Sequence, residues 1–181
     1  MKIYHEEARD LPVAGEYDVI VAGSGPAGVS AAVMAGRAGC SVLLLEYNNS
    51  VGGISTSGLM SHWTGSVNSR LYTEILTRMA EKNEGELHGK IIPTIDPENL
   101  KTVYLEMLKE AGADLLLYTL VCGVTMEGNR VTGVITESKS GRRVFRAKVV
   151  VDGTGDGDVA AMAGVPIPSD GRPTEKCSRR R

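Results

Sequence analysis

The feature that most constrains this chain is a glycine-rich turn between an apolar run and a helical pattern. Tyr17–Ala22 is a nearly continuous apolar run, typical of a strand that is buried on both faces. Gly23–Gly28 follows with the spacing G-x-G-x-x-G, and Pro26–Ala38 has the small-residue spacing of a helix. A second apolar run, Ser41–Glu46, completes a strand–helix–strand unit, which predicts a right-handed crossover and a parallel sheet.

The rest of the chain predicts the remaining layers of the same domain. The expected elements are a Gly-, Ser- and Thr-rich loop over 47–68, a helix capped by Ser69, a helix opened by Asp96-Pro97-Glu98, a core strand over 113–118, an antiparallel meander over 120–146 and a core strand over 148–152. We therefore expect an α/β fold, a Rossmann-like parallel sheet with a small antiparallel β-meander inserted.

Length and composition bound the class of protein. The 181 residues are enough for about one domain, which we divide into a polar lead-in over 1–16, a Rossmann-like domain over 17–165 and an irregular tail over 166–181. Hydrophobic residues make up 42% and charged residues 23%, which is typical of a globular protein. The net charge of −2 provides no electrostatic footprint for nucleic acid or an anionic membrane, and no secretory leader is visible. We expect a cytoplasmic protein with reduced thiols.

Each residue of the glycine turn has a physical role if the turn binds a dinucleotide. Gly23 permits the tight turn, Gly25 lets backbone N–H groups reach a pyrophosphate, and Gly28 permits close packing of helix on strand. Pro26 and Ala27 open the helix, whose N-terminus attracts phosphate. The alternative is a structural glycine turn that binds nothing.

A carboxylate at the end of the second strand adds to this signal. Glu46 can accept hydrogen bonds from the hydroxyls of a ribose, which is the role of an acidic residue at this place in dinucleotide-binding folds. Its negative charge would repel a 2′-phosphate, so the sequence argues against NADP at this site.

Three motifs together resemble a known family. Asp18–Gly28, with small residues in the helix that follows and with Glu46, resembles the FAD-binding N-terminus of glutathione-reductase-like flavoproteins. Gly52–Leu59 and Asp152–Ala160 resemble the FAD-dependent oxidoreductases grouped near the flavoprotein component of heterodisulfide reductase. The resemblance runs from about residue 10 to about residue 172, and it implies FAD as the cofactor.

The resemblance also implies roles for two regions outside the glycine turn. The backbone of Gly52 and Gly53 is expected to approach the diphosphate or the ribityl chain, although a flexible loop would have the same composition. In the resembling family the meander after the third strand positions the adenine through backbone contacts, which here fall near Val121.

The last glycine-rich stretch is expected beside the flavin nucleotide. Gly155 and Asp156 match the family's A-T-G-D stretch, in which Gly153 here replaces the usual Ala. The spacing of Asp152, Asp156 and Asp158 also suggests a calcium loop, but it lacks the register and the terminal Glu of an EF-hand. We therefore predict no metal site.

Catalytic residues are poorly marked in this sequence. His62 follows the loop that the resemblance directs toward the flavin, so it is a candidate proton donor, whereas His5 and His88 look solvated. Cys40 and Cys122 are expected to be small buried hydrophobes, and a third cysteine, Cys177, lies far from both. Some relatives carry 4Fe–4S clusters, but the cysteine spacing here does not support one.

The sequence predicts the FAD-binding portion of a flavin-dependent oxidoreductase that acts on an unidentified small molecule. The resembling fold has a further strand, which is missing here, and Cys177–Arg181 departs from the family pattern. We interpret the chain as a truncated or frame-shifted product that lacks its C-terminal half or needs a partner chain, and the alternative is a natural short protein. The alternatives are a non-catalytic nucleotide-binding protein, an inert fragment and an NAD-dependent oxidoreductase.

Overall fold

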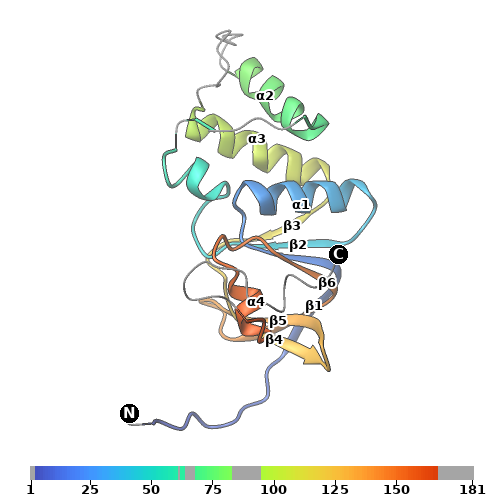
Figure 1. Ribbon diagram of the computed structural model, residues 1–181, viewed down its shortest axis with the longest axis vertical. Coiled ribbons are helices and arrows are strands. Elements are labelled where there is room, and N and C mark those ends of the chain that lie inside the picture. The colour runs from blue at the N-terminus through green and yellow to red at the C-terminus, as the bar shows by residue number, and fades with distance from the viewer. Residues whose placement is uncertain (1–2, 61, 64–67, 83–94, 167–181) are drawn as a thin grey trace.

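The computed structural model describes residues 3–60, 62–63, 68–82 and 95–166 (Figure 1). The elements in chain order are β1 (Val13–Ala22), α1 (Pro26–Arg37), β2 (Val42–Leu45), the short 3-10 helix η1 (Gly53–Ser55), α2 (Arg70–Lys82), α3 (Pro97–Glu110), β3 (Asp114–Leu116), β4 (Leu120–Glu127), β5 (Arg130–Glu137), β6 (Arg143–Asp152) and α4 (Asp158–Met162). The strands form one sheet in the order β3-β2-β1-β6-β5-β4.

This sheet has a parallel part and an antiparallel part. β1 pairs in parallel with β2 on one side and with β6 on the other, and β3 pairs in parallel with β2. β5 pairs antiparallel with both β4 and β6. The expected α/β class is therefore confirmed, including the Rossmann-like parallel sheet and the antiparallel meander.

Two hydrophobic cores lie on the two faces of the sheet. Val21 and Leu44 pack in one core with Val103 of α3, while Ile20 packs in the other with Phe145 of β6. Figure 1 shows α1, α3 and α2 in successive layers on one side of β1 and β2, with α4 beside β4 and β5 on the other side. Neighbouring residues of β1 thus enter different cores, which explains why its sequence is a continuous apolar run.

Two predicted strand boundaries were wrong. β1 begins at Val13 and not at Tyr17, because β6 runs beside its first half and pairs Val144 with Val13. The last meander segment and the core strand over 148–152 are one continuous strand, β6. β6 is long because its first part pairs with β5 and with β1 at once, while its second part continues along β1.

Other differences are smaller. The strand expected over 113–118 is only β3, the loop over 47–68 contains η1, and α4 follows β6 although no helix was predicted there. The start of α3 was correctly predicted: Asp96 caps it by accepting a hydrogen bond from the Asn99 amide at 2.8 Å. His88, Cys177 and residues 167–181 of the expected tail lie outside the described residues.

Candidate functional site

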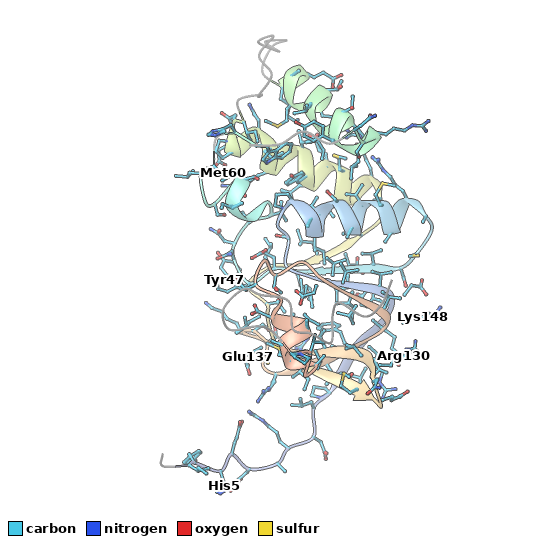
Figure 2. All side chains as sticks on the ribbon, viewed as in Figure 1. His5, Tyr47, Met60, Arg130, Glu137 and Lys148 are labelled. Atoms are coloured by element: carbon cyan, nitrogen blue, oxygen red, sulfur yellow. The ribbon has the colours of Figure 1, made fainter. Side chains whose placement is uncertain are left out.

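A groove of about 720 Å³ runs along the carboxyl ends of β1, β2 and β6. This is the edge where ligands bind in open parallel α/β sheets. Figure 2 shows Tyr47 at this edge and Lys148 and Arg130 toward the opposite one. The groove is lined by three segments that the sequence analysis singled out, the glycine turn, the end of β2 and the stretch after β6, together with the start of β4: Gly23–Ala27, Leu45–Asn48, Gly53, Ile54, Thr119–Val121 and Asp152–Asp158.

Three glycines bring α1 against the ends of β1 and β6. A Cβ on Gly28 would lie 1.9 Å from the carbonyl oxygen of Gly23, and a Cβ on Gly23 would lie 2.5 Å from the carbonyl oxygen of Gly153. At Gly153 a Cβ would meet the Gly23 oxygen at 3.0 Å. Gly23 also has φ of +89°, a conformation that favours glycine. The first and third motifs of the sequence are thus in direct backbone contact.

The N-terminus of α1 opens into the groove without a side-chain cap. Gly25 is the N-cap residue, and no side chain caps the first amides of the helix. The first turn also contains no acidic residue. A Cβ on Gly25 would meet nothing within 4 Å, so the backbone beside it borders open space. Pro26 occupies the first position of the helix, where its missing N–H costs nothing. The positive end of the helix dipole and its unpaired amides are therefore available to an anion.

Glu46 is a buried carboxylate that is held by neutral donors. Its side chain is only 5% exposed. The amide and the hydroxyl of Ser24 donate to Oε2 at 3.0 and 2.5 Å, and the amide and side chain of Asn48 donate to Oε1 at 2.7 and 3.0 Å. These bonds lock the end of β2 to the glycine turn.

The glycine pair after β2 packs on the same turn. The Gly52 amide donates to the carbonyl oxygen of Ser24 at 2.7 Å, and a Cβ on Gly53 would lie 3.0 Å from the Cα of Gly25. Both glycines have positive φ, +104° and +53°. Gly53 lines the groove, whereas Gly52 sits behind it and holds the loop in place.

The stretch after β6 is ordered by Asp152. Its carboxylate accepts hydrogen bonds from the hydroxyl and the amide of Thr154 at 2.6 and 3.2 Å, and from the Ala160 amide at 2.9 Å. Burial raises the pKa of Asp152, but the hydrogen bonds from Thr154 and Ala160 outweigh that effect, so the pKa lies below its usual value. Gly155 and Asp156 lie within this stretch and line the groove.

The other end of the groove is formed by the start of β4. The Thr119 amide donates to the Glu46 carbonyl at 2.9 Å, and the Tyr118 amide donates to the Asn48 carbonyl at 3.1 Å. Val121 is 9% exposed and lines the groove beside the half-exposed Leu120. This end therefore offers apolar surface next to backbone groups, which suits a flat, weakly polar ring.

Among the described residues, the charged side chains that line the groove are all negative. They are Glu46, Asp152, Asp156 and Asp158, and no Lys, Arg or His is found in this part of the lining. A phosphate bound here must therefore be stabilised by backbone N–H groups and by the helix dipole of α1.

Most of the predicted site residues meet in this groove. Those that line it are Gly23, Gly25, Pro26, Ala27, Glu46, Gly53, Val121, Gly155 and Asp156. Gly28 and Gly52 stand behind it as packing residues, and the exposed His62 is not among the lining residues. Sequence reasoning missed Ser24 and Asn48, which hold Glu46. Two positions in the sequence could have indicated them: Ser24 lies within the glycine turn, and Asn48 lies two residues after Glu46.

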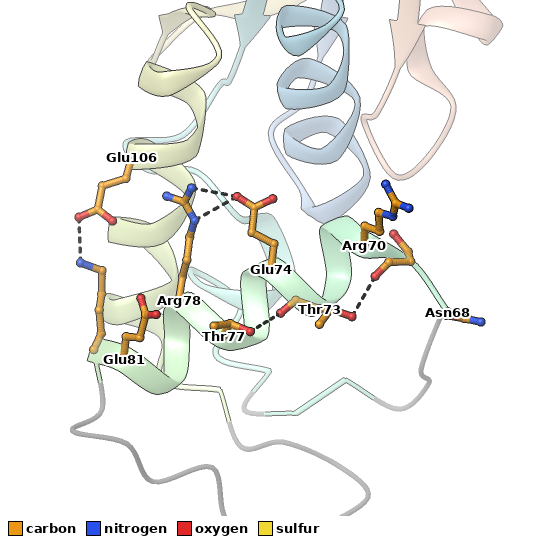
Figure 3. Close-up of a pocket in the computed structure, with 10 residues that line it drawn as sticks. Asn68, Arg70, Thr73, Glu74, Thr77, Arg78, Glu81 and Glu106 are labelled. Carbon is orange, nitrogen blue, oxygen red and sulfur yellow. Dashed lines mark hydrogen bonds and ion pairs between the residues drawn. The ribbon is translucent and has the colours of Figure 1, made fainter.

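A second hollow, of about 800 Å³, lies over α2 and the neighbouring part of α3 (Figure 3). Four of the six described charged side chains that line it are paired: Arg78 contacts Glu74 at 2.9 Å and Glu110 at 2.6 Å, and Lys82 contacts Glu106 at 2.8 Å. Although this hollow is no smaller than the groove, most of its charges already have partners.

Two further observations concern ion and membrane binding. Across residues 3–60, 62–63, 68–82 and 95–166, no group of three or more His, Cys, Asp or Glu side chains is placed to hold a metal ion. Cys40 and Cys122 are free and only partly buried. No helix in those ranges is long and apolar enough to cross a membrane.

Comparison with known proteins adds family information to this geometry. A family model described as FAD dependent oxidoreductase matches residues 18–177. The chain is 30% identical over 168 residues to digeranylgeranylglycerophospholipid reductase 1 of Methanococcoides burtonii, covering 83% of this chain and 40% of that protein. It is 33% identical over 156 residues to thiamine thiazole synthase of Methanococcus aeolicus, covering 80% of this chain and 57% of that protein. The chain thus spans about half the length of these relatives.

Solved structures show the same fold. A geranylgeranyl bacteriochlorophyll reductase-like protein from Thermoplasma acidophilum matches with a TM-score of 0.63 and 19% identity, over 85% of this chain and 44% of that one. THI4 from Thermovibrio ammonificans matches with a TM-score of 0.60 and 20% identity, over 81% of this chain and 61% of that one. At these identities the likeness concerns the fold alone.

Proposed function

This chain belongs to the FAD-dependent oxidoreductase family, and from that premise we propose that the groove binds FAD, so that the chain is the FAD-binding portion of a flavin-dependent oxidoreductase. The observation that carries the proposal is the convergence of the uncapped α1 N-terminus, Glu46 and the Gly155 stretch on one groove. When bound, FAD supplies the transfer of hydride or electrons, while the protein orients and surrounds it.

The residues of the groove fit the parts of FAD. The amides at the start of α1, around Gly25 and Ala27, bind the pyrophosphate, because only backbone groups there oppose its charge. Glu46 accepts hydrogen bonds from the hydroxyls of the adenosine ribose, and these hydroxyls replace the partly buried Asn48 side chain as donors to Oε1. The adenine lies toward Val121, and the flavin half extends past Gly155.

We also propose that further polypeptide pairs with the open edge of β6. β5 pairs with β6 only over Arg143–Arg146, whereas β1 pairs with β6 as far as Asp152. Within the described ranges no strand occupies the other edge of residues 147–152, and Val149 is 53% exposed. An uncovered apolar strand edge is a site for strand addition. The added strand belongs either to polypeptide outside the described residues or to a partner.

The substrate is proposed only as a small molecule. The relatives reported above are named for two different activities, reduction of a digeranylgeranylglycerophospholipid and synthesis of thiamine thiazole. This chain spans only part of each. Because His62 lies outside the lining of the groove, we assign no catalytic residue to the chain.

Flavin titration tests the proposal. The full 181-residue chain, shown to be folded by circular dichroism, is titrated with FAD while flavin fluorescence and protein-bound absorbance are followed. We expect one FAD per chain and at least about tenfold weaker binding of FMN, because FMN lacks the adenosine that Glu46 and Val121 contact. NADP⁺ is expected to bind more weakly than NAD⁺, since Glu46 repels its 2′-phosphate. A folded chain that binds NAD⁺ more tightly than FAD would contradict the proposal.

A further inference from the structure

A separate cavity of about 370 Å³ lies between the start of α1 and the helices α2 and α3. Among the described residues it shares only Pro26 and Ala27 with the groove, so the two hollows adjoin at the N-terminus of α1. None of the described residues that line it is acidic, basic or histidine: Pro26, Ala27, Ser30, Trp63, Ser69, Leu71, Tyr72, Ile75 and Tyr104. Such a lining disfavours a charged ligand, because a charge would lose its hydration there without gaining a partner.

One deeply buried hydroxyl in the wall of this cavity has no hydrogen-bond partner among the described residues. Tyr104 of α3 is 1% exposed, and burial alone raises the pKa of its phenol, with no contribution from a hydrogen bond. Over the described part of the chain, the one fully enclosed side-chain nitrogen or oxygen without a partner is Nε of Arg142. The Tyr104 oxygen also has no partner but does not belong to this fully enclosed class, so part of its surface is accessible. Because Tyr104 lines this cavity, we take the accessible surface of its oxygen to face the cavity.

An unpaired buried hydroxyl is unusual in a folded protein. Buried polar groups are nearly always hydrogen-bonded, since leaving one unpaired lowers stability. The other hydroxyl on the α1 side, that of Ser30, is already used, because it donates to the Pro26 carbonyl at 2.6 Å. Ser69 and Tyr72 also carry hydroxyls, but both residues are only partly buried, so Tyr104 offers the deeply buried hydroxyl to a ligand.

An aromatic pair forms another part of the wall. The rings of Trp63 and Tyr72 lie 5.6 Å apart with a tilt of 39° between their planes. The indole N–H of Trp63 donates to the Ser55 hydroxyl at 2.7 Å, which fixes the ring to the loop of η1. Rigid aromatic walls favour apolar ligands. Trp63 is also the one tryptophan of the sequence, so its fluorescence reports on this cavity.

We propose that this cavity binds a small uncharged molecule that is mostly apolar and carries one carbonyl or hydroxyl oxygen, which hydrogen-bonds to Tyr104. The apolar lining, the volume and the buried, unpaired hydroxyl of Tyr104 each select for that chemistry. Binding at this cavity does not require bound FAD. Its role as a subsite for the substrate, adjoining the pyrophosphate end of α1, rests on the proposed function.

Two small probes of similar size test separately whether the cavity binds an apolar molecule and whether Tyr104 hydrogen-bonds to its oxygen. The full chain without FAD is titrated with cyclohexanone, which carries a carbonyl oxygen, and with methylcyclohexane, which carries none, while the emission of Trp63 is followed. We expect saturable shifts with both probes. The Tyr104→Phe variant should bind cyclohexanone about fivefold more weakly and methylcyclohexane unchanged, because only one hydrogen bond is lost.

Further variants distinguish a binding role from a structural one. Tyr104→Phe should unfold at the same temperature as the parent chain or higher, since it removes an unpaired buried group. Ser30→Leu should weaken both probes by filling the cavity, while Ser30→Ala serves as the matched control and leaves both affinities unchanged. Equal cyclohexanone affinity in the parent chain and in Tyr104→Phe, or no shift of Trp63 emission with either probe in a folded chain, overturns the proposal. Because no FAD is present, failure here is distinct from failure of flavin binding.

Discussion

The groove at the strand ends and the hollow over α2 differ in what they are made of. The groove consists of glycine backbone, an uncapped helix start and a buried carboxylate held by neutral donors. The hollow over α2 is lined by polar side chains and by long charged side chains, and most of the charged ones form ion pairs with one another (Figure 3). Their volumes are similar, about 720 and 800 Å³. Volume therefore does not mark a binding site, whereas rigid groups that still lack partners do.

Two glutamates show the same difference at the level of single residues. Glu46 is 5% exposed and accepts its hydrogen bonds from Ser24 and Asn48. The side chain of Glu74 is 29% exposed and pairs with Arg37 and Arg78. Water can replace the partners of Glu74 but not those of Glu46, so equal substitutions at the two positions should have unequal effects.

The largest expected effect comes from the packing of the groove itself. Gly28→Ala should lower the free energy of unfolding by about 3 kcal/mol or more, because its Cβ would overlap the Gly23 carbonyl oxygen. Gly25→Ala is the matched control, since its Cβ meets no atom and its φ of −62° suits alanine. We expect Gly25→Ala to keep the stability and to weaken FAD binding about tenfold. Equal denaturation midpoints for the two variants would contradict the packing described here.

The next effect concerns the buried carboxylate. Glu46→Gln should lower the free energy of unfolding by about 2 kcal/mol, because the amide NH₂ would face donors that have lost their acceptor. Urea denaturation measures this effect, with Glu74→Gln as the control that should cost less than about 1 kcal/mol. If Glu74→Gln proved the more destabilising of the two, the comparison between the groove and the α2 hollow would fail.

The smallest effect is the pH dependence of the ion pairs over α2. The hydrogen bond from Arg37 lowers the pKa of Glu74, and the hydrogen bond from Arg78 lowers that of Glu110. A lowered pKa in the folded state contributes stability above the ordinary glutamate pKa, and this stability is lost as the pH falls through the lowered value. The protection of the α2 amides, relative to the intrinsic exchange rate at each pH, should therefore fall in acid and in high salt before the protection of β1 changes. Simultaneous loss of protection in both elements would show that the ion pairs have no local role.

The parts of the molecule that depend on local patterns could be predicted from the sequence. The first strand–helix–strand unit, the cap at Asp96 and most groove residues follow from apolar periodicity and glycine spacing. The start of β1 at Val13 could not be predicted, because its first half is a strand only through pairing with β6. Likewise, β6 is one strand since it has two partners at once.

The candidate site divides in the same way. Gly25 and Glu46 could be placed by their spacing, whereas the hydrogen bonds that Ser24 and Asn48 make to Glu46 depend on how the turn and the strand end meet in space. Nothing in the sequence of α3 marks Tyr104, and its unpaired hydroxyl becomes visible only once the cavity beside it is known. His62 was expected near the flavin from loop position alone, and that position does not bring it into the lining of the groove.

The measurement that tests the central claim most directly is a map of amide NMR shifts as FAD is added to the ¹⁵N-labelled chain. We predict that the perturbed amides concentrate at Gly25–Gly28, Glu46, Val121 and Gly155, while the amides of α2 stay unchanged. Shifts concentrated at α2, or shifts spread evenly over the chain, would contradict the conclusion that the groove at the strand ends is the dinucleotide site.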